Sequence, residues 1–285
     1  MDTSVIVTGL SFPEAPRWRE GLLYFVDMGT GAVLSLDPHT RETSLRVPKV
    51  PGRPSGLAWD QEGRLMVVSM GRSCLYVDAG LDRLSLVADL SGVPGGWRND
   101  AVGHPNGWTY VGATGRPADL VAVDQHGTVQ IVARDIGAPN GMVVTPGGET
   151  LIVAEFAAER LIAFTVHPDG SLSDQRIWAA LPRGCTPDGI CLDRSGAVWL
   201  AWADTDQVLR VREGDSIEQA VTTSQPAFAC MLGGIDRRSL YICSAPGLAR
   251  GGSPETPGLY RDDRGGRAGS RPSPLVPLPR TPAGY

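Results

Sequence analysis

Hydrophobic positions along the chain occur in short runs that are separated by turn-forming residues and recur at a nearly constant interval. One kind of run appears six times, as LLYFV, LMVVS, TYVG, LIVAE, VWLAW and LYICS, and successive copies begin 43, 44, 42, 47 and 42 residues apart. A second run follows each copy, and often a third. Runs of this length predict β-strands, and the apolar spacing of amphipathic helices is nearly absent.

The repeat predicts an all-β fold, namely a six-bladed β-propeller with four antiparallel strands per blade. Its period of about 43 residues is the size of one blade. A four-stranded sheet buries both faces only when it packs between neighbours, as in a ring. We expect one propeller over residues 1–262, closed by an N-terminal strand near residues 4–9 that completes the last blade. Residues 263–285, rich in proline and glycine, are expected to form a tail or lid.

A polar residue recurs just upstream of the repeated hairpins, in the phrases SFPEAPRW, GRPSGLAW, WRNDAVGH, APNGMVVT, TPDGICLD and AFACMLGG. Aligned on the downstream strand, the phrases place six residues at one position: Glu14, Ser55, Asp100, Asn140, Asp188 and Cys230. Because the first strand of each blade lines the central channel of a propeller, these side chains should face one shared space. The alternative is that Asn140-Gly141 and Asp188-Gly189 are simple turn residues.

Three carboxylates at this position, those of Glu14, Asp100 and Asp188, would repel one another in a narrow channel unless a cation neutralises them. Oxygen donors suit a hard divalent cation, so we expect Ca²⁺, with Mg²⁺, Mn²⁺ and Zn²⁺ as alternatives. We interpret Ser55 as a hydroxyl of the pocket wall. Cys230 is interpreted as a small buried residue, because no basic partner for a nucleophilic thiol is evident.

Composition narrows the class of protein. With 285 residues, a formal net charge of −5 and no run of lysine or arginine, the chain offers no case for nucleic acid or an anionic membrane as a partner. No apolar stretch approaches the ~20 residues of a membrane span, and the first residues lack the features of a signal peptide. Five cysteines at irregular spacing indicate reduced thiols and a cytoplasmic protein. The sequence leaves the oligomeric state open.

Several motifs together resemble the gluconolactonase/regucalcin (senescence marker protein) family of calcium-dependent lactonases. They are PEAPRW at Glu14, ND at Asn99-Asp100, PNGM at Asn140, PDGICLDRSGAVWLA at Asp188, and CMLGGIDRRSLYICSA near the end. The resemblance covers roughly residues 8–246. It implies a six-bladed propeller and metal ligands at Glu14, Asn140 and Asp188. It also implies that Asn99 and Asp100 lie beside metal-bound water or substrate.

One position departs from the pattern of that family. Trp97 stands two residues before Asn99, where sugar-lactone hydrolases that it resembles often have arginine. Arg98 does not replace that arginine, because alternation along a strand turns it away from the side that Trp97 occupies. The pocket is therefore expected to be more apolar and aromatic than one that binds a polyhydroxy sugar acid.

These features predict a divalent-metal-dependent hydrolase of a lactone or a related cyclic ester, with a small molecule as its substrate. The metal would polarise the carbonyl, and a carboxylate, either Asp188 or Asp100, would activate the attacking water as general base. The expected substrate-binding residues are Asn99, Asp100, Trp97 and Ser55. The alternatives are an organophosphate or aryl-ester hydrolase at the same metal site, and a non-catalytic calcium-binding propeller.

Overall fold

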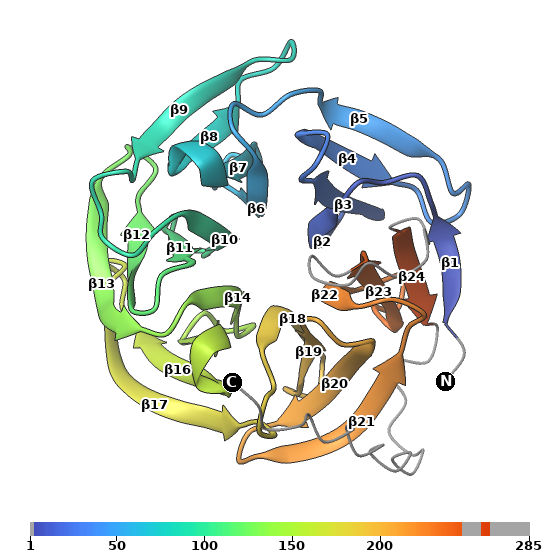
Figure 1. Cartoon of the computed structure of the whole chain (residues 1–285). Helices are drawn as coiled ribbons and strands as arrows, with labels where there is room; N and C mark the ends of the chain where they lie inside the picture. Colours follow the sequence, from blue (N-terminus) through green and yellow to red (C-terminus); the bar gives the residue numbers. More distant parts are fainter. Residues whose placement is uncertain (1–2, 247–257, 263–285) are drawn as a thin grey trace, which may run out of the picture.

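The protein is a ring of antiparallel β-sheets around a central axis (Figure 1). The structure, a computed structural model, describes residues 3–246 and 258–262. Within these residues the strands form six four-stranded sheets. This arrangement confirms the predicted all-β propeller built from four-stranded antiparallel sheets.

Each sheet extends outward from the axis (Figure 1). The innermost strands are β2 (Pro13–Arg19), β6 (Pro54–Trp59), β10 (Arg98–Gly103), β14 (Pro139–Val144), β18 (Pro187–Leu192) and β22 (Ala227–Gly233). The second strands are β3 (Leu22–Asp27), β7 (Leu65–Ser69), β11 (Thr109–Ala113), β15 (Thr150–Glu155), β19 (Val198–Trp202) and β23 (Ser239–Ser244). The third strands are β4 (Ala32–Leu36), β8 (Cys74–Asp78), β12 (Ala118–Val123), β16 (Arg160–Val166), β20 (Gln207–Arg212) and β24 (Gly258–Asp262). The outermost strands are β5 (Thr43–Val47), β9 (Leu84–Asp89), β13 (Val129–Ile136), β17 (Leu172–Ala180), β21 (Ser216–Thr222) and β1 (Ser4–Val7).

The N-terminal strand closes the ring. β1 pairs with β24, so the strand order in this sheet is β1-β24-β23-β22. One sheet thus joins the first described strand of the chain to the last three. The predicted tail or lid, residues 263–285, lies outside the described residues.

The hydrophobic core lies between neighbouring sheets. All five residues of β7 and all six of β12 are buried, as expected for strands covered on both faces. One cluster joins Val143 and Ile152 of one sheet to Ile190 and Leu200 of the next. Burial of apolar surface contributes about 25 cal/mol per Å², so contact between sheets is a main source of stability and holds the ring together.

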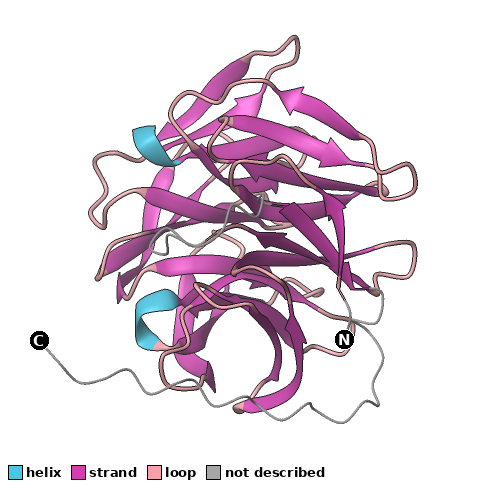
Figure 2. Cartoon of the chain, turned by 45° about the vertical axis from the view of Figure 1, so that its right-hand side comes forward, coloured by secondary structure: helices cyan, strands magenta, loops and turns pink. Residues whose placement is uncertain are grey.

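The fully described connections between strands are short, and helical structure in the described part is confined to two single turns (Figure 2). The 3₁₀ turns η1 (Met70–Arg72) and η2 (Phe156–Ala158) follow the second strands β7 and β15. They lie on the same side of the ring and mark the end of the channel at which the innermost strands begin (Figure 2). In the described residues no helix is long and apolar enough to cross a membrane.

Every innermost strand carries a β-bulge near its beginning. In each sheet the last residue of the second strand has a partner on the innermost strand, and the pairing register shifts soon afterwards. These partners are Pro13, Pro54, Arg98, Pro139, Pro187 and Ala227. A bulge interrupts the ladder and redirects the side chains within it. The chain therefore repeats one local distortion around the whole axis.

The residues that follow these partners form what we call the axial ring: Glu14, Ser55, Asn99, Asn140, Asp188 and Phe228. This register corrects the alignment made from sequence, which placed Asp100 and Cys230 at this position. The third repeat has two consecutive polar residues within its bulge, and sequence alone does not say which one occupies the ring. The sixth repeat has Phe228 there, so no polar side chain marks the position.

Glycine follows three of the six axial-ring residues, Ser55, Asn140 and Asp188, where neighbouring innermost strands approach closely. Asn140-Gly141 lies within β14, so the interpretation of this pair as a turn is wrong; the same holds for Asp188-Gly189 in β18. A Cβ atom on Gly141 would lie 2.4 Å from the backbone oxygen of Asp188, and one on Gly189 would lie 2.4 Å from Cβ of Ala229. Neither distance is possible without displacing the next sheet.

Substitution Gly141→Ala should therefore lower the stability of the fold by about 1–3 kcal/mol, the usual effect of overpacking a tight contact. Gly92→Ala is the matched control, because a Cβ atom there meets no atom within 4 Å. Thermal unfolding of the two variants and the parent measures the difference. Equal melting temperatures for the two variants would contradict the close-approach explanation.

Candidate functional site

The axial ring is connected by hydrogen bonds that pass from sheet to sheet. The Ser55 hydroxyl donates to the backbone oxygen of Asn99 (2.8 Å), and Asn99 Nδ2 donates to Asn140 Oδ1 (3.0 Å). The Asn140 side chain in turn hydrogen-bonds Asp188. Ser55 is buried, whereas Glu14, Asn99, Asn140 and Asp188 are partly accessible. The structure thus brings most of the predicted polar residues together at one end of the channel.

The carboxyl groups at the axis lie in each other's electric field. Burial raises the pKa of Glu14 to about 8, and the negative charge of Asp100 raises it further. A hydrogen bond from the Ala15 backbone partly opposes this rise. Burial likewise raises the pKa of Asp188 well above its ordinary value, reinforced by the charges of Glu14 and Asp100. The three carboxyl groups are therefore close enough to influence one another's ionisation.

Asp100 differs from the other two acids because it is paired with an arginine. Its side chain is buried, and Oδ1 accepts hydrogen bonds from Arg17 Nη2 (2.7 Å) and from the Ala101 backbone (2.8 Å). Burial raises the pKa of Asp100, while the guanidinium opposes the rise. Sequence analysis missed Arg17, although it lies within the PEAPRW motif.

Arg17 is the exception in a second ring of residues below the axial ring. The residues three positions after the axial ring are Arg17, Ala58, Val102, Val143, Cys191 and Met231, and five of these six described residues are apolar. When the repeats are aligned, this position is apolar in every repeat except the one with Arg17. That exception was the signal by which the sequence could have revealed Arg17.

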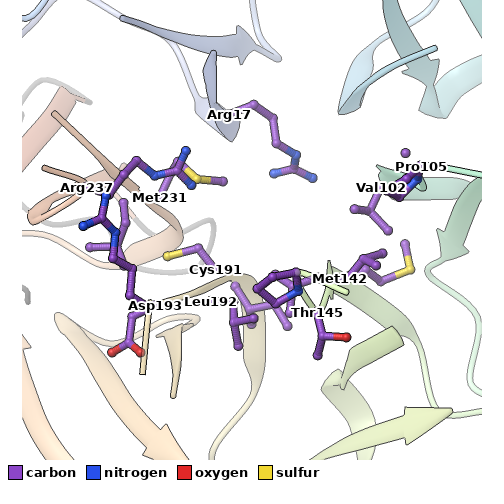
Figure 3. Close-up of a pocket in the computed structure, with 17 residues that line it drawn as sticks. Arg17, Val102, Pro105, Met142, Thr145, Cys191, Leu192, Asp193, Met231 and Arg237 are labelled. Carbon is purple, nitrogen blue, oxygen red and sulfur yellow. The ribbon is translucent and has the colours of Figure 1, made fainter. Parts of the chain in front are cut away.

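A cavity of about 490 Å³ opens on the other side of Arg17 (Figure 3). Val102, Val143, Cys191 and Met231 of the second ring line it, together with residues from the ends of the innermost strands. No axial-ring residue lines it. Arg17 therefore separates this largely apolar cavity from the acidic end of the channel.

The aromatic residue expected in the pocket lies further out. Trp97 is 57% exposed, and the Arg53 guanidinium lies 5.9 Å from the centre of its ring. Arg98 points the other way, as alternation predicts: it is fully buried and donates to the backbone oxygens of Val93, Pro94 and Asp119. Arg98 thus anchors the loop that carries Trp97.

Cys230 lies inside the protein and not on the axis. Its side chain is 1% exposed, and its thiol contacts the backbone oxygens of Gly189 and Trp199 and the thiol of Cys191. Burial raises its pKa well above the ordinary value. These surroundings suit a packed thiol and do not favour a nucleophile.

The donors at the axis suit a hard cation. Among the described residues no three His, Cys, Asp or Glu side chains gather closely enough to hold a metal by themselves. The predicted set has two carboxyl groups, Glu14 and Asp188, and an amide, Asn140. Rotating the amides of Asn99 and Asn140 by half a turn keeps their mutual hydrogen bond and turns Asn140 Oδ1 towards Asp188. Oxygen donors and buried, mutually repelling acids then fit a divalent ion.

These observations define a class of protein: a β-propeller with a partly accessible acidic site at one end of its channel. Residues 12–246 match the sequence profile of the family described as SMP-30/gluconolactonase/LRE-like region. The chain belongs to this family, as the sequence motifs predicted.

A curated relative resembles the chain over most of its length, and two solved structures share its fold. Pentonolactonase XacC of Haloferax volcanii is 26% identical over 264 residues, which cover 89% of this chain and 88% of that protein. The calcium-binding protein regucalcin of Agrobacterium tumefaciens superposes with a TM-score of 0.78 at 20% identity, over 90% of this chain and 92% of that one. A gluconolactonase of Xanthomonas campestris gives a TM-score of 0.75 at 21% identity, over 91% and 88% of the two chains. The two structures show the same fold.

The raised pKa values predict that protein stripped of metal with EDTA loses stability as the pH rises from about 5 to 8. The folded chain still binds a proton at Glu14, with a pKa of about 8, where the unfolded chain, with a pKa of 4.5, has released it. Each increase in pH over this interval therefore favours unfolding. Melting temperatures at pH 5, 6.5 and 8 measure the slope, and Glu14→Gln should flatten it. A parent melting temperature that rises steadily over this interval would refute the interpretation.

Proposed function

We propose that this protein hydrolyses a lactone or a related cyclic ester with a divalent cation at the axial ring. The observation that carries the proposal is the proximity of Glu14, Asp100 and Asp188 in a partly accessible site of a family whose relatives include a pentonolactonase and a gluconolactonase. Acids that raise each other's pKa at an accessible axis are typical of a functional site.

Glu14, Asn140 and Asp188 would hold the cation, and Ca²⁺ is the first choice because oxygen atoms are the only donors. The regucalcin of Agrobacterium tumefaciens, described as calcium-binding, supports this choice. A bound dication would polarise the substrate carbonyl and stabilise the negative charge that develops on its oxygen, an effect worth several kcal/mol in comparable sites.

Asp100 is the proposed general base. Its Oδ1 is engaged by Arg17 and Ala101, and no described residue donates a hydrogen bond to Oδ2. As a water oxygen bonds to the carbonyl carbon, Oδ2 takes the proton that the water releases. The ring C–O bond then breaks, and the leaving oxygen recovers that proton from Asp100 to give the hydroxy acid. Asp188 is the alternative base, and its proposed role as a cation ligand makes it the weaker candidate, because a bound dication lowers the pKa of a carboxylate.

The remaining predicted residues take supporting roles in this proposal. Asn99 lies between Ser55 and Asn140, where its amide can orient water or substrate. The Ser55 hydroxyl donates a hydrogen bond to the Asn99 backbone oxygen, so in this proposal Ser55 positions Asn99 and does not bind substrate. Trp97 would contact only the outer part of a substrate, because its ring lies at the surface.

Substitutions at the axis should separate cation binding from turnover. Glu14→Gln and Asp188→Asn should abolish Ca²⁺ binding, measured by calorimetry, and hydrolysis of any substrate in a panel of aldonolactones and aromatic lactones. Asp100→Asn should still bind Ca²⁺ but lose turnover by roughly 10²–10⁴-fold, the usual scale for a general base. Glu20→Gln is the control, because within the described part of the chain that exposed side chain pairs with Arg19 alone. Unchanged Ca²⁺ binding in both ligand variants would rule out the proposed site.

Hydrolysis of an aryl ester or a phosphotriester at the same site is the second candidate. The exposed ring of Trp97, at the acidic end of the channel, favours substrates with an aromatic part. Adding phosphotriesters and aryl esters to the panel distinguishes the two reactions. Binding of Ca²⁺ without turnover of any compound would instead indicate a non-catalytic calcium-binding propeller.

A further inference from the structure

The Arg17 side chain links three consecutive sheets beneath the axial ring. From β2, its Nε donates to the Leu57 backbone oxygen on β6 (3.1 Å), and Nη2 donates to Asp100 Oδ1 (2.7 Å) and the Ala101 backbone oxygen (2.7 Å) on β10. Nη1 donates to the backbone oxygen of Pro16 (3.0 Å). Every nitrogen of the guanidinium is thus engaged, and the side chain is only 12% exposed.

The surroundings of Arg17 argue against a role in solubility or in binding an external anion. Val102 and Met231 of the second ring are apolar and share its cavity (Figure 3). Asp100 is the single carboxylate among the described residues with which it forms an ion pair. A buried charge in apolar surroundings is destabilising unless it is paired. Arg17 therefore depends on its ion pair with Asp100.

The pairing also selects one oxygen of Asp100. Arg17 and the Ala101 backbone both donate hydrogen bonds to Oδ1. Because rotation of the carboxylate would break both bonds, the two donors fix its orientation. Oδ2 receives no hydrogen bond from the described residues. The arrangement therefore presents one fixed, unoccupied acceptor beside the axial ring.

Charge counting points the same way. Glu14, Asp100 and Asp188 carry three negative charges when ionised, and Arg17 balances one of them. A dication then balances the other two, which leaves Asp100 outside the set of groups that the cation must neutralise.

We propose that Arg17 is the positioning residue of this site: it holds Asp100 through Oδ1 and aims Oδ2 at the reacting water. This inference rests on the proposed hydrolysis. Arg17 itself touches neither substrate nor cation, and it acts only through Asp100.

The test compares Arg17→Gln, Arg17→Lys, Asp100→Asn and the double variant on a lactone that the parent hydrolyses. Arg17→Gln should lower kcat by about 10²-fold, the effect of a misplaced catalytic group, with KM and Ca²⁺ affinity within a few-fold of the parent. Lysine at this position should restore part of kcat. In the Asp100→Asn background, Arg17→Gln should cause no further loss.

Arg19→Gln is the matched control, because Arg19 lies on the same strand but stacks on Trp59 at the surface, 5.3 Å from the ring centre. It should retain the parent kcat. A normal kcat in Arg17→Gln, or an additional loss in the double variant, would overturn the positioning role while the proposed function stands.

A second readout requires no substrate. Arg17→Gln and Asp100→Asn should each lower the melting temperature by several degrees, because each change leaves a buried charge unpaired. The double variant removes both charges, so it should unfold at no lower a temperature than the less stable of the two single variants. If the parent hydrolyses no lactone, the proposed function fails and the Arg17–Asp100 link is judged on this cycle alone. Additive losses of melting temperature would then overturn the link.

Discussion

Convergence of the innermost strands on one axis is the constraint on which the rest of the molecule depends. Glu14 and Asp188 are far apart in sequence, yet ring closure places them close enough for the charge of one to raise the pKa of the other. Glycine after the axial ring permits this closeness, since even a methyl group at Gly141 would strike the neighbouring strand. The folded chain therefore assembles acids that keep their protons to a higher pH than free acids do, unless a cation compensates their negative charge.

The channel has two chemically different ends, and Arg17 lies between them. The end marked by the 3₁₀ turns holds the polar axial ring, whereas the other end opens into a cavity with an apolar wall that includes Val143 and Met231. Arg98 and Arg17 serve this design differently. Among the described residues Arg98 donates to backbone oxygens alone and fixes a loop, whereas Arg17 binds a carboxylate and connects the two levels of the channel.

The sequence allowed the class of fold, the closing N-terminal strand and the acidic cluster to be predicted, because a repeat period and alternating apolar runs are global signals. Position within a repeat was harder to assign. Asn99 and Asp100 are adjacent polar residues, and only the register of a bulge decides which one joins the axial ring. Asn140-Gly141 matches a turn in local statistics, and only the contact with Asp188 explains its place in a strand. The contact between Arg17 and Asp100 spans three sheets, so no local pattern contains it.

The pairing of β1 with β24 closes the ring with strands from both ends of the described chain. During synthesis the residues of the axial ring emerge one after another, from Glu14 to Phe228, well before β24 is available. Pairing of β1 with β24 therefore waits for the last described strand, and the ring closes only after every residue of the axial ring has been made.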